Sequence, residues 1–179
     1  DLLALVAASE SVAEDVYVAL PEGWCADVAA RRAMRAVEPS ATQRHQYLSA
    51  GRMPLRHFLA LEADLGVARD QVRLYRPSGK ANHPKAVLTP DEGFARLLGY
   101  YLSEGCVSRN GATDKIIWTF ALHEEAFVED VATALEALGL QPRRERRAST
   151  LVVYATSWLL GWLLRDVWQA GVASSDKRI

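Results

Sequence analysis

The sequence has no uninterrupted run of about 18 apolar residues, the length that a membrane-spanning helix needs, so no segment is expected to cross a membrane. It also lacks a basic segment leading into a long apolar stretch near the first residue, so a secretory signal is not expected. Cysteine is scarce, because Cys25 and Cys106 are the only two and have no C-x-x-C spacing. Two free, packed thiols in a reducing cytoplasm are therefore expected.

Basic residues are absent from the first 30 positions, which carry six acidic residues. Positions 31–60 reverse this balance, with six arginines against Glu38 as the one acid. A second basic cluster consists of Arg143, Arg144, Arg146 and Arg147. The net charge of −1 therefore hides a strong local asymmetry. Because phosphate binding depends on local positive potential, the overall charge does not exclude a nucleic-acid partner.

The 179 residues suffice for one compact domain or two small ones. Turn-forming residues from Pro77 to Pro84 (PSGKANHP) predict a loop, which is the natural place for a domain boundary. Residues 1–88 are then expected to form a basic, mainly helical N-terminal region. Its expected helices cover residues 2–8, 26–37, 40–48 and 55–65, and its expected strands residues 15–20 and 71–76.

Residues 89–179 have a more regular pattern that indicates an α+β fold. Thr89 is expected to cap a helix that begins at Pro90, with Glu92 closing a capping box, and Gly105 ends this helix. The elements expected after it are a strand over 115–123, a helix over about 124–138 closed by Gly139, two strands around the arginine cluster, and a helix over about 157–166. This order predicts an antiparallel sheet covered on one face by helices.

The end of the first of these helices has an unusual sequence. Residues 97–105 read LLGYYLSEG. Glu104 falls in the last turn, where the helix dipole disfavours negative charge, so its carboxylate is costly unless a cation or hydrogen-bond donors meet it. Gly99 in mid-helix costs about 1 kcal/mol, so we expect it to be buried where another backbone approaches closely. Together these features indicate a helix packed on a partner, which delivers a carboxylate to a shared point at its C-terminal end.

This string resembles the LAGLIDADG motif of homing endonucleases, in the DOD-type form found in intein-associated enzymes. The resemblance covers about residues 89–179 and implies the first half of an enzyme that cuts both strands of a specific DNA site. It matches Gly99 to the helix-packing glycine, Glu104 to the catalytic, metal-binding acid and Gly105 to the closing glycine. It matches Ser103 to the residue whose backbone carbonyl faces the metal.

The resemblance also implies a divalent cofactor, Mg²⁺ or Mn²⁺. In the family two such helices pack side by side, and each acid binds an ion at the centre of the DNA. Hard cations prefer oxygen ligands, and paired metals stabilise the attacking and leaving oxygens of phosphodiester hydrolysis. Residues 176–179 (DKRI) resemble the K-x-I-P element that precedes the second motif of intein endonucleases. This makes Lys177 a candidate catalytic residue that stabilises charge or helps to activate water.

The same resemblance places the sheet in the major groove of double-stranded DNA. Alternation predicts that one strand face lies under the helices, namely Ile116, Trp118, Phe120 and Leu122. The arginines of the second basic cluster, at a hairpin, are expected to reach phosphates or the edge of guanine. The expected DNA-contacting residues are Ser108, Arg109, Thr119, Arg143, Arg144, Arg146 and Arg147.

The family needs two motifs, and no other helix of the sequence ends in an apolar segment, an acid and a glycine. The second motif is expected either downstream of Ile179 or in a second copy that forms a homodimer. The resemblance favours the downstream position, because the K-x-I-P element normally introduces a second motif in the same chain. Self-splicing is not expected, since the sequence neither starts with Cys or Ser nor ends in His-Asn.

Several functional alternatives stay open at the level of sequence. The region is a cleaving enzyme, a non-cleaving DNA-binding regulator, or a decayed copy that keeps the fold. A structural α+β interaction domain, without salt-sensitive affinity for DNA, ranks last. For positions 31–60 two interpretations also remain: an accessory DNA-binding module, such as a helix-turn-helix, or a solvated helical face packed on the acidic first 30 residues.

Overall fold

The computed structural model describes residues 1–77, 82–111 and 113–173. They divide into two compact units, of which the first comprises Asp1–Pro77 and Lys85–Leu88 and the second the other described residues. None of the helices in these described ranges is long and apolar enough to cross a membrane. Each unit has its own core and is described separately below.

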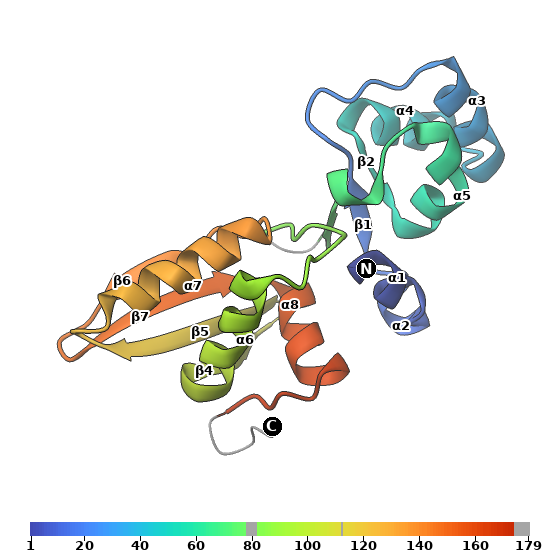
Figure 1. Cartoon of the computed structure of the whole chain (residues 1–179). Coiled ribbons are helices and arrows are strands. Elements are labelled where there is room, and N and C mark those ends of the chain that lie inside the picture. Colours follow the sequence, from blue (N-terminus) through green and yellow to red (C-terminus); the bar gives the residue numbers. More distant parts are fainter. Residues whose placement is uncertain (78–81, 112, 174–179) are drawn as a thin grey trace. The chain divides into compact units, whose positions relative to one another are not determined.

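The first unit combines short helices with a small antiparallel sheet (Figure 1). Its helices are α1 (Leu2–Ala7), α2 (Glu10–Ala13), α3 (Val28–Val37), α4 (Ala41–Ala50), α5 (Leu55–Leu65) and the 3-10 turn η1 (Arg69–Gln71). Its strands are β1 (Tyr17–Ala19), β2 (Arg52–Pro54) and β3 (Arg73–Tyr75), in the order β2-β1-β3. The N-terminal region is mainly helical, as expected. Each of its strands has only three residues.

The core of this unit begins at the small sheet. Val18 lies opposite Met53 on one side and Leu74 on the other, and all three side chains are fully buried. The expected helices over 26–37, 40–48 and 55–65 are confirmed to within two residues, with Ser40 capping α4 through a 3.3 Å hydrogen bond from the Gln43 amide. Strand β2 was not expected, because three residues that end in proline carry no alternating pattern.

The second unit has the α+β architecture expected from the sequence. Its helices are α6 (Glu92–Glu104), α7 (Glu125–Ala137), α8 (Trp158–Trp162) and a π-helical turn, η2 (Leu163–Val167). Its strands are β4 (Gly105–Asn110), β5 (Thr113–Ala121), β6 (Arg143–Arg146) and β7 (Thr150–Thr156). All neighbouring strands are antiparallel, in the order β4-β5-β7-β6.

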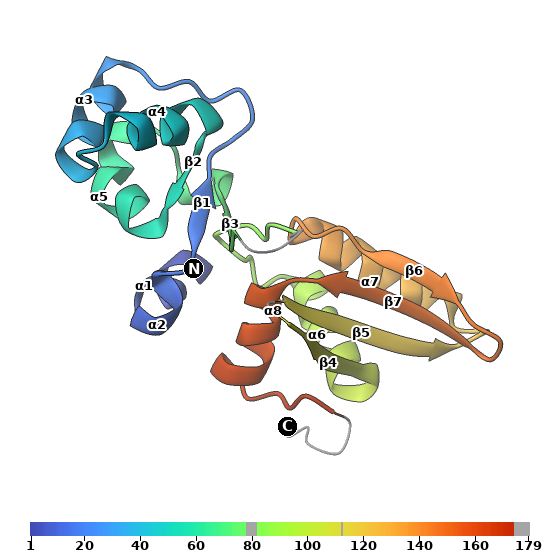
Figure 2. The same cartoon turned by 180° about the vertical axis from the view of Figure 1, so that it is seen from behind.

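Helices α6 and α7 cover one face of this sheet, and Figure 2 shows the opposite face without a helix over it. Ile116, Trp118 and Phe120 are buried on the covered face, as the alternation predicts. The Trp118 ring meets Tyr101 of α6 edge-on, with ring centroids 6.2 Å apart. The prediction for Leu122 is wrong, because β5 ends at Ala121 and the Leu122 side chain is 37% exposed.

In this unit the start of α6 differs from the sequence prediction, and the end of α7 agrees with it. Asp91, not Thr89, caps α6, since its carboxylate accepts a 2.8 Å hydrogen bond from the Phe94 amide. The expected Thr89 capping box is therefore wrong, and the helix starts two residues later than Pro90. Helix α7 ends as expected, because Gly139 takes a positive φ of 82° directly after the C-cap Leu138.

Both cysteines are free, as expected, but only one of them is partly packed. Cys106 is half-buried on β4, whereas Cys25 is exposed in the segment before α3. The expectation of a packed thiol is therefore wrong for Cys25, because that segment forms no helix or strand that could enclose it.

A buried carboxylate fixes the last helix against the sheet. Asp114 on β5 is completely buried, and its Oδ2 lies 3.0 Å from Nη1 of Arg165. Arg109 approaches the other carboxylate oxygen at 3.5 Å. Gly161 of α8 packs so closely on the Asp114 side chain that any larger residue there would overlap it. The network joins β4, β5 and the C-terminal helices.

We expect Asp114→Asn to lower the free energy of unfolding by about 2 kcal/mol. The amide keeps the volume of the side chain but removes the charge that is paired with Arg165 in a buried place. Asp166 pairs with the same guanidinium at 2.8 Å from a side chain that is 46% exposed. Asp166→Asn should therefore cost less than about 1 kcal/mol. Urea denaturation measures both, and equal losses would contradict the assigned role of Asp114.

Candidate functional site

Helix α6, which contains the 97–105 string, is anchored to the sheet by its inner face. Leu97 and Tyr101, one turn apart, are buried. The Tyr101 hydroxyl donates a 2.6 Å hydrogen bond to the carbonyl oxygen of Gly171. Burial is the main cause that raises the pKa of Tyr101 to about 12, so this donor stays protonated at neutral pH. These contacts fix the rotation of α6 about its axis.

A second set of contacts ties α6 to α7. The guanidinium of Arg96 makes two hydrogen bonds to the carboxylate of Asp130, at 2.8 and 3.0 Å, and the Tyr100 hydroxyl donates to the same carboxylate at 3.1 Å. The hydrogen bond from Arg96 is the largest cause that lowers the pKa of Asp130. Sequence periodicity gave no sign of this triad, because it joins residues 30 or more positions apart.

The outer face of α6 carries small residues at four-residue spacing. Ala95, Gly99 and Ser103 are all exposed and share this face because residues i and i+4 lie one turn apart. A Cβ added at Gly99 would meet nothing within 4 Å. The expectation that Gly99 is buried is therefore wrong for the single chain. The described residues leave this helix face open, flat and free to receive a second backbone.

Glu104 stands at the point where α6 ends and the sheet begins. Gly105 is the first residue of β4 and pairs with Trp118 of β5, so no loop separates the helix from the strand. A Cβ at Gly105 would lie 2.5 Å from Cδ2 and 2.8 Å from the backbone carbonyl oxygen of Tyr101. Glycine is thus required by this abrupt change of direction. The close approach holds the preceding carboxylate at a fixed place at the helix end.

The carboxylate of Glu104 is exposed, and within the described residues no cation or donor meets it. The hydroxyl of Ser103 donates back into its own helix, to the carbonyl oxygens of Gly99 and Tyr100 at 3.3 Å each. Nowhere in residues 1–77, 82–111 and 113–173 do three His, Cys, Asp or Glu side chains gather as a metal site. To hold a divalent cation, Glu104 therefore needs oxygen ligands besides the His, Cys, Asp and Glu side chains of these ranges.

The uncovered sheet face presents a mixed polar surface next to this helix end. Strand register aligns Ser108 of β4 with Lys115 of β5 and Thr156 of β7. Thr119 lies on the same face of β5, four residues further along. The Lys115 ammonium lies over the Tyr154 ring, 3.6 Å from its centroid. Sequence reasoning missed this cation–π pair, although the position of Lys115 on the polar side of an alternating strand was a signal that could have found it.

The arginine cluster at the hairpin is divided between the two faces of the sheet. Arg143 aligns with Tyr154 on the uncovered face. Arg144 points to the other side and makes two hydrogen bonds to Glu129 of α7, at 2.8 and 2.9 Å.

The remaining arginine candidates for DNA contact are placed as follows. Arg146 aligns with Leu151 on the helix-covered side of the sheet, at the exposed edge. Arg147, just past β6, pairs with Glu145 at 2.9 Å. Arg109 alternates with Ser108 and so points to the covered side, toward Asp114. Of these arginines, Arg143 is the best placed to meet a ligand on the uncovered face.

Lys177, the other candidate catalytic residue, lies outside the described residues.

Comparison with known proteins agrees with the string at the end of α6. Residues 91–160, from the cap of α6 into α8, match the family model of the LAGLIDADG-like domain. Over 140 residues the chain is 28% identical to the uncharacterized protein MJ1054 of Methanocaldococcus jannaschii, a match that covers 75% of this chain. The match covers 16% of the length of that protein. No solved structure matches the chain.

Proposed function

We propose that residues 89–179 form one half of a site-specific DNA endonuclease of the LAGLIDADG type. One observation carries the proposal: an exposed carboxylate, Glu104, ends a helix whose outer face is open, within the region that matches the LAGLIDADG-like domain. A helix with small residues along an open face suits close packing against a second helix. An acid at its end is then brought to the junction of the two.

Pairing through Ala95, Gly99 and Ser103 would bring Glu104 next to the acid of a second motif. Two carboxylates at one point repel each other unless a cation lies between them. The exposed carboxylate of Glu104 and the backbone carbonyl of Ser103 suit Mg²⁺ or Mn²⁺, which prefer oxygen ligands. When bound, such ions supply an activated water and stabilise charge on the attacking and leaving oxygens. Glu104 then acts by holding the cation, and Lys177 by stabilising developing charge on the phosphate.

The uncovered sheet face is proposed as the DNA-contacting surface. Ser108, Lys115 and Thr119 offer hydrogen bonds on it, and Arg143 offers a guanidinium that fits the O6 and N7 edge of guanine or a phosphate. Arg109 and Arg144 contribute less in this arrangement, because each is turned toward an acid on the helix-covered side. An intein-associated origin, and homing by insertion at the cut site, follow from the DOD-type form of the motif and are part of the proposal.

The second half is supplied either by a segment downstream of Ile179 or by a second copy of this chain. Sedimentation of the 179-residue chain at rising concentration distinguishes these sources, since only the second gives a dimer. Cleavage of a duplex library with randomised sites, with and without Mg²⁺, tests the activity of the assembled protein. Cleavage that requires Mg²⁺ supports the enzyme. Salt-sensitive DNA binding without cleavage supports the alternative, a DNA-binding regulator or decayed endonuclease that keeps the fold.

We expect Arg143→Gln to flatten the plot of log affinity against log salt by about 0.9, the value for one phosphate contact on duplex DNA. If Arg143 reads a guanine, specificity at one base pair should also fall by about 1–3 kcal/mol. Arg144→Gln is the matched control, because it removes the same charge one residue away on the opposite face. Fluorescence anisotropy over a salt series measures both. Equal slopes for the two variants would remove the uncovered face from the interface.

A further inference from the structure

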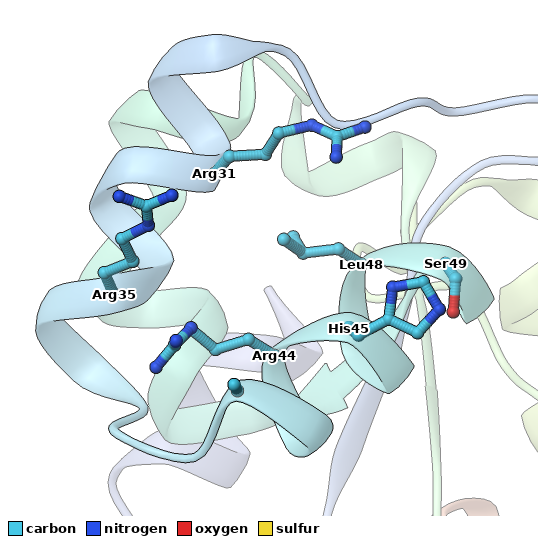
Figure 3. A pocket seen from close by; sticks show the side chains of 7 residues that line it. Arg31, Arg35, Arg44, His45, Leu48 and Ser49 are labelled. Carbon is cyan, nitrogen blue, oxygen red and sulfur yellow. The ribbon is translucent and has the colours of Figure 1, made fainter.

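A basic cleft lies in the first unit, between helices α3 and α4. Arg31 and Arg35 of α3 line it together with Arg44, His45, Leu48 and Ser49 of α4, and Figure 3 shows the Arg44 and Leu48 side chains reaching toward α3. Its volume is about 310 Å³, and Ala41 completes the lining. Three arginines and a histidine thus line one hollow, and none of its lining residues is acidic. The cleft therefore offers positive charge to a ligand.

The spacing of the arginines along the helices places their positive charges close together on the side of the cleft. Arg31 and Arg35 lie one turn apart on α3, so their guanidinium groups repel each other along the same face. Helix α4 begins at Ala41 after the cap Ser40, which places Arg44 and His45 in its second turn, and Arg44 reaches toward α3. Like charges at this spacing destabilise a helix slightly, so helix stability does not account for the arrangement.

Two of the guanidinium groups are held in place by backbone carbonyls. Nε of Arg31 donates to the carbonyl oxygen of Ala26 at 3.1 Å. Nη1 of Arg44 donates to the carbonyl oxygens of Glu38 and Pro39, at 2.8 and 2.6 Å. Both groups keep further N–H donors that these bonds do not use. A guanidinium anchored through part of its donors is preorganised to offer the rest to an anion.

In the part of the chain that the structure describes, the charge of the cleft arginines is not met by a carboxylate, unlike that of several other arginines. Arg69, Arg96 and Arg144 each pair with a carboxylate in their own unit. Within the described residues, by contrast, no carboxylate lies within ion-pair distance of the three arginines of the cleft. The neighbouring acid, Glu38, is buried, and its carboxylate accepts a 2.9 Å hydrogen bond from the Ser40 amide. The positive charge is therefore left for a ligand to neutralise.

We propose that this cleft binds a backbone phosphate of DNA, with the guanidinium groups on the phosphate oxygens and Leu48 against the adjoining deoxyribose. The proposal rests on the proposed function, because it takes the DNA that a LAGLIDADG-type enzyme holds as the source of the phosphate. It adds a binding site in the first unit, outside the motif and the sheet of the second. Phosphate contacts of this kind supply affinity and register without reading sequence.

The test is DNA binding by the full 179-residue chain over a salt series, with a duplex of random sequence. Arg35→Gln should flatten the plot of log affinity against log salt by about 0.9. Arg32→Gln is the control, because Arg32 is also exposed on α3 but lines a different hollow together with Asp64. Its slope should match that of the unchanged chain. Arg31→Gln repeats the test on the same wall of the cleft.

One further measurement distinguishes the two sources of phosphate. Thermal melting in phosphate and in chloride of equal ionic strength tests a free phosphate as the ligand. If phosphate raises the melting temperature only when Arg35 is present, while the DNA slope does not change, the cleft binds a small phosphorylated ligand and the proposal is overturned. Equal slope changes for Arg32→Gln and Arg35→Gln would overturn it as well, since they indicate diffuse attraction. A slope change specific to Arg35, together with no DNA cleavage by the protein assembled from both halves, would leave this proposal standing and refute the endonuclease.

Discussion

Glu104→Gln is expected to abolish Mg²⁺-dependent cleavage by the assembled enzyme and to leave DNA affinity within about tenfold of the original. The amide keeps the shape of the side chain but loses the ionic ligation of a hard cation. Affinity should persist because the proposed DNA contacts come from cations and donors of the sheet face, whereas the Glu104 carboxylate carries a negative charge that does not attract phosphates. The measurement pairs a plasmid-cleavage assay with anisotropy on the same target.

The control for this variant is Glu136→Gln. Glu136 is likewise an exposed acid in the last turn of a helix, α7, but it lies away from the outer face of α6. Its loss should leave cleavage unchanged, which separates loss of a ligand from loss of one negative charge. Full cleavage by Glu104→Gln would contradict the catalytic assignment. Loss of DNA binding together with cleavage would make Glu104 a structural residue.

Gly99→Leu is expected to have opposite effects on the single chain and on its assembly. In the single chain nothing lies within 4 Å of the added Cβ, and replacing a helical glycine should raise stability by roughly 0.5–1 kcal/mol. In the assembly the leucine should overlap the second helix, at a cost of about 1–3 kcal/mol or more. Cleavage and pairing of the two halves should therefore be lost together, while the melting temperature of the single chain rises.

Ala137→Leu is the matched control for Gly99→Leu. It adds an apolar side chain to an exposed site at the end of α7, so it should affect neither assembly nor cleavage. Sedimentation velocity and thermal melting of both variants provide the comparison. Unchanged sedimentation and cleavage for Gly99→Leu would mean that the outer face of α6 does not receive a second helix. A fall in melting temperature would mean that the face is covered within the chain itself.

The sequence alone determined the features that depend on neighbouring residues. The abrupt end of α6 at Glu104 and Gly105, the buried face of β5 and the positive φ at Gly139 were all predictable. These features depend on the helical and strand periods, on glycine and on capping. Each of these signals acts over a few neighbouring positions, so it can be predicted from the sequence. Even these signals were off by two residues at the start of α6, where the capping candidates Thr89 and Asp91 lie two positions apart.

The tertiary structure decided which of these residues face a partner. Sequence spacing gave Arg143 and Arg144 equal standing, yet strand register sends one to the uncovered face and the other to Glu129. The sequence pattern suggested that Gly99 is buried, whereas in the structure Gly99 lies on an open helix face. It gave no sign of Asp114 and Arg165, which are 51 positions apart and meet at 3.0 Å. Register, long-range ion pairs and uncovered faces arise from contacts between distant segments, and no local pattern encodes them.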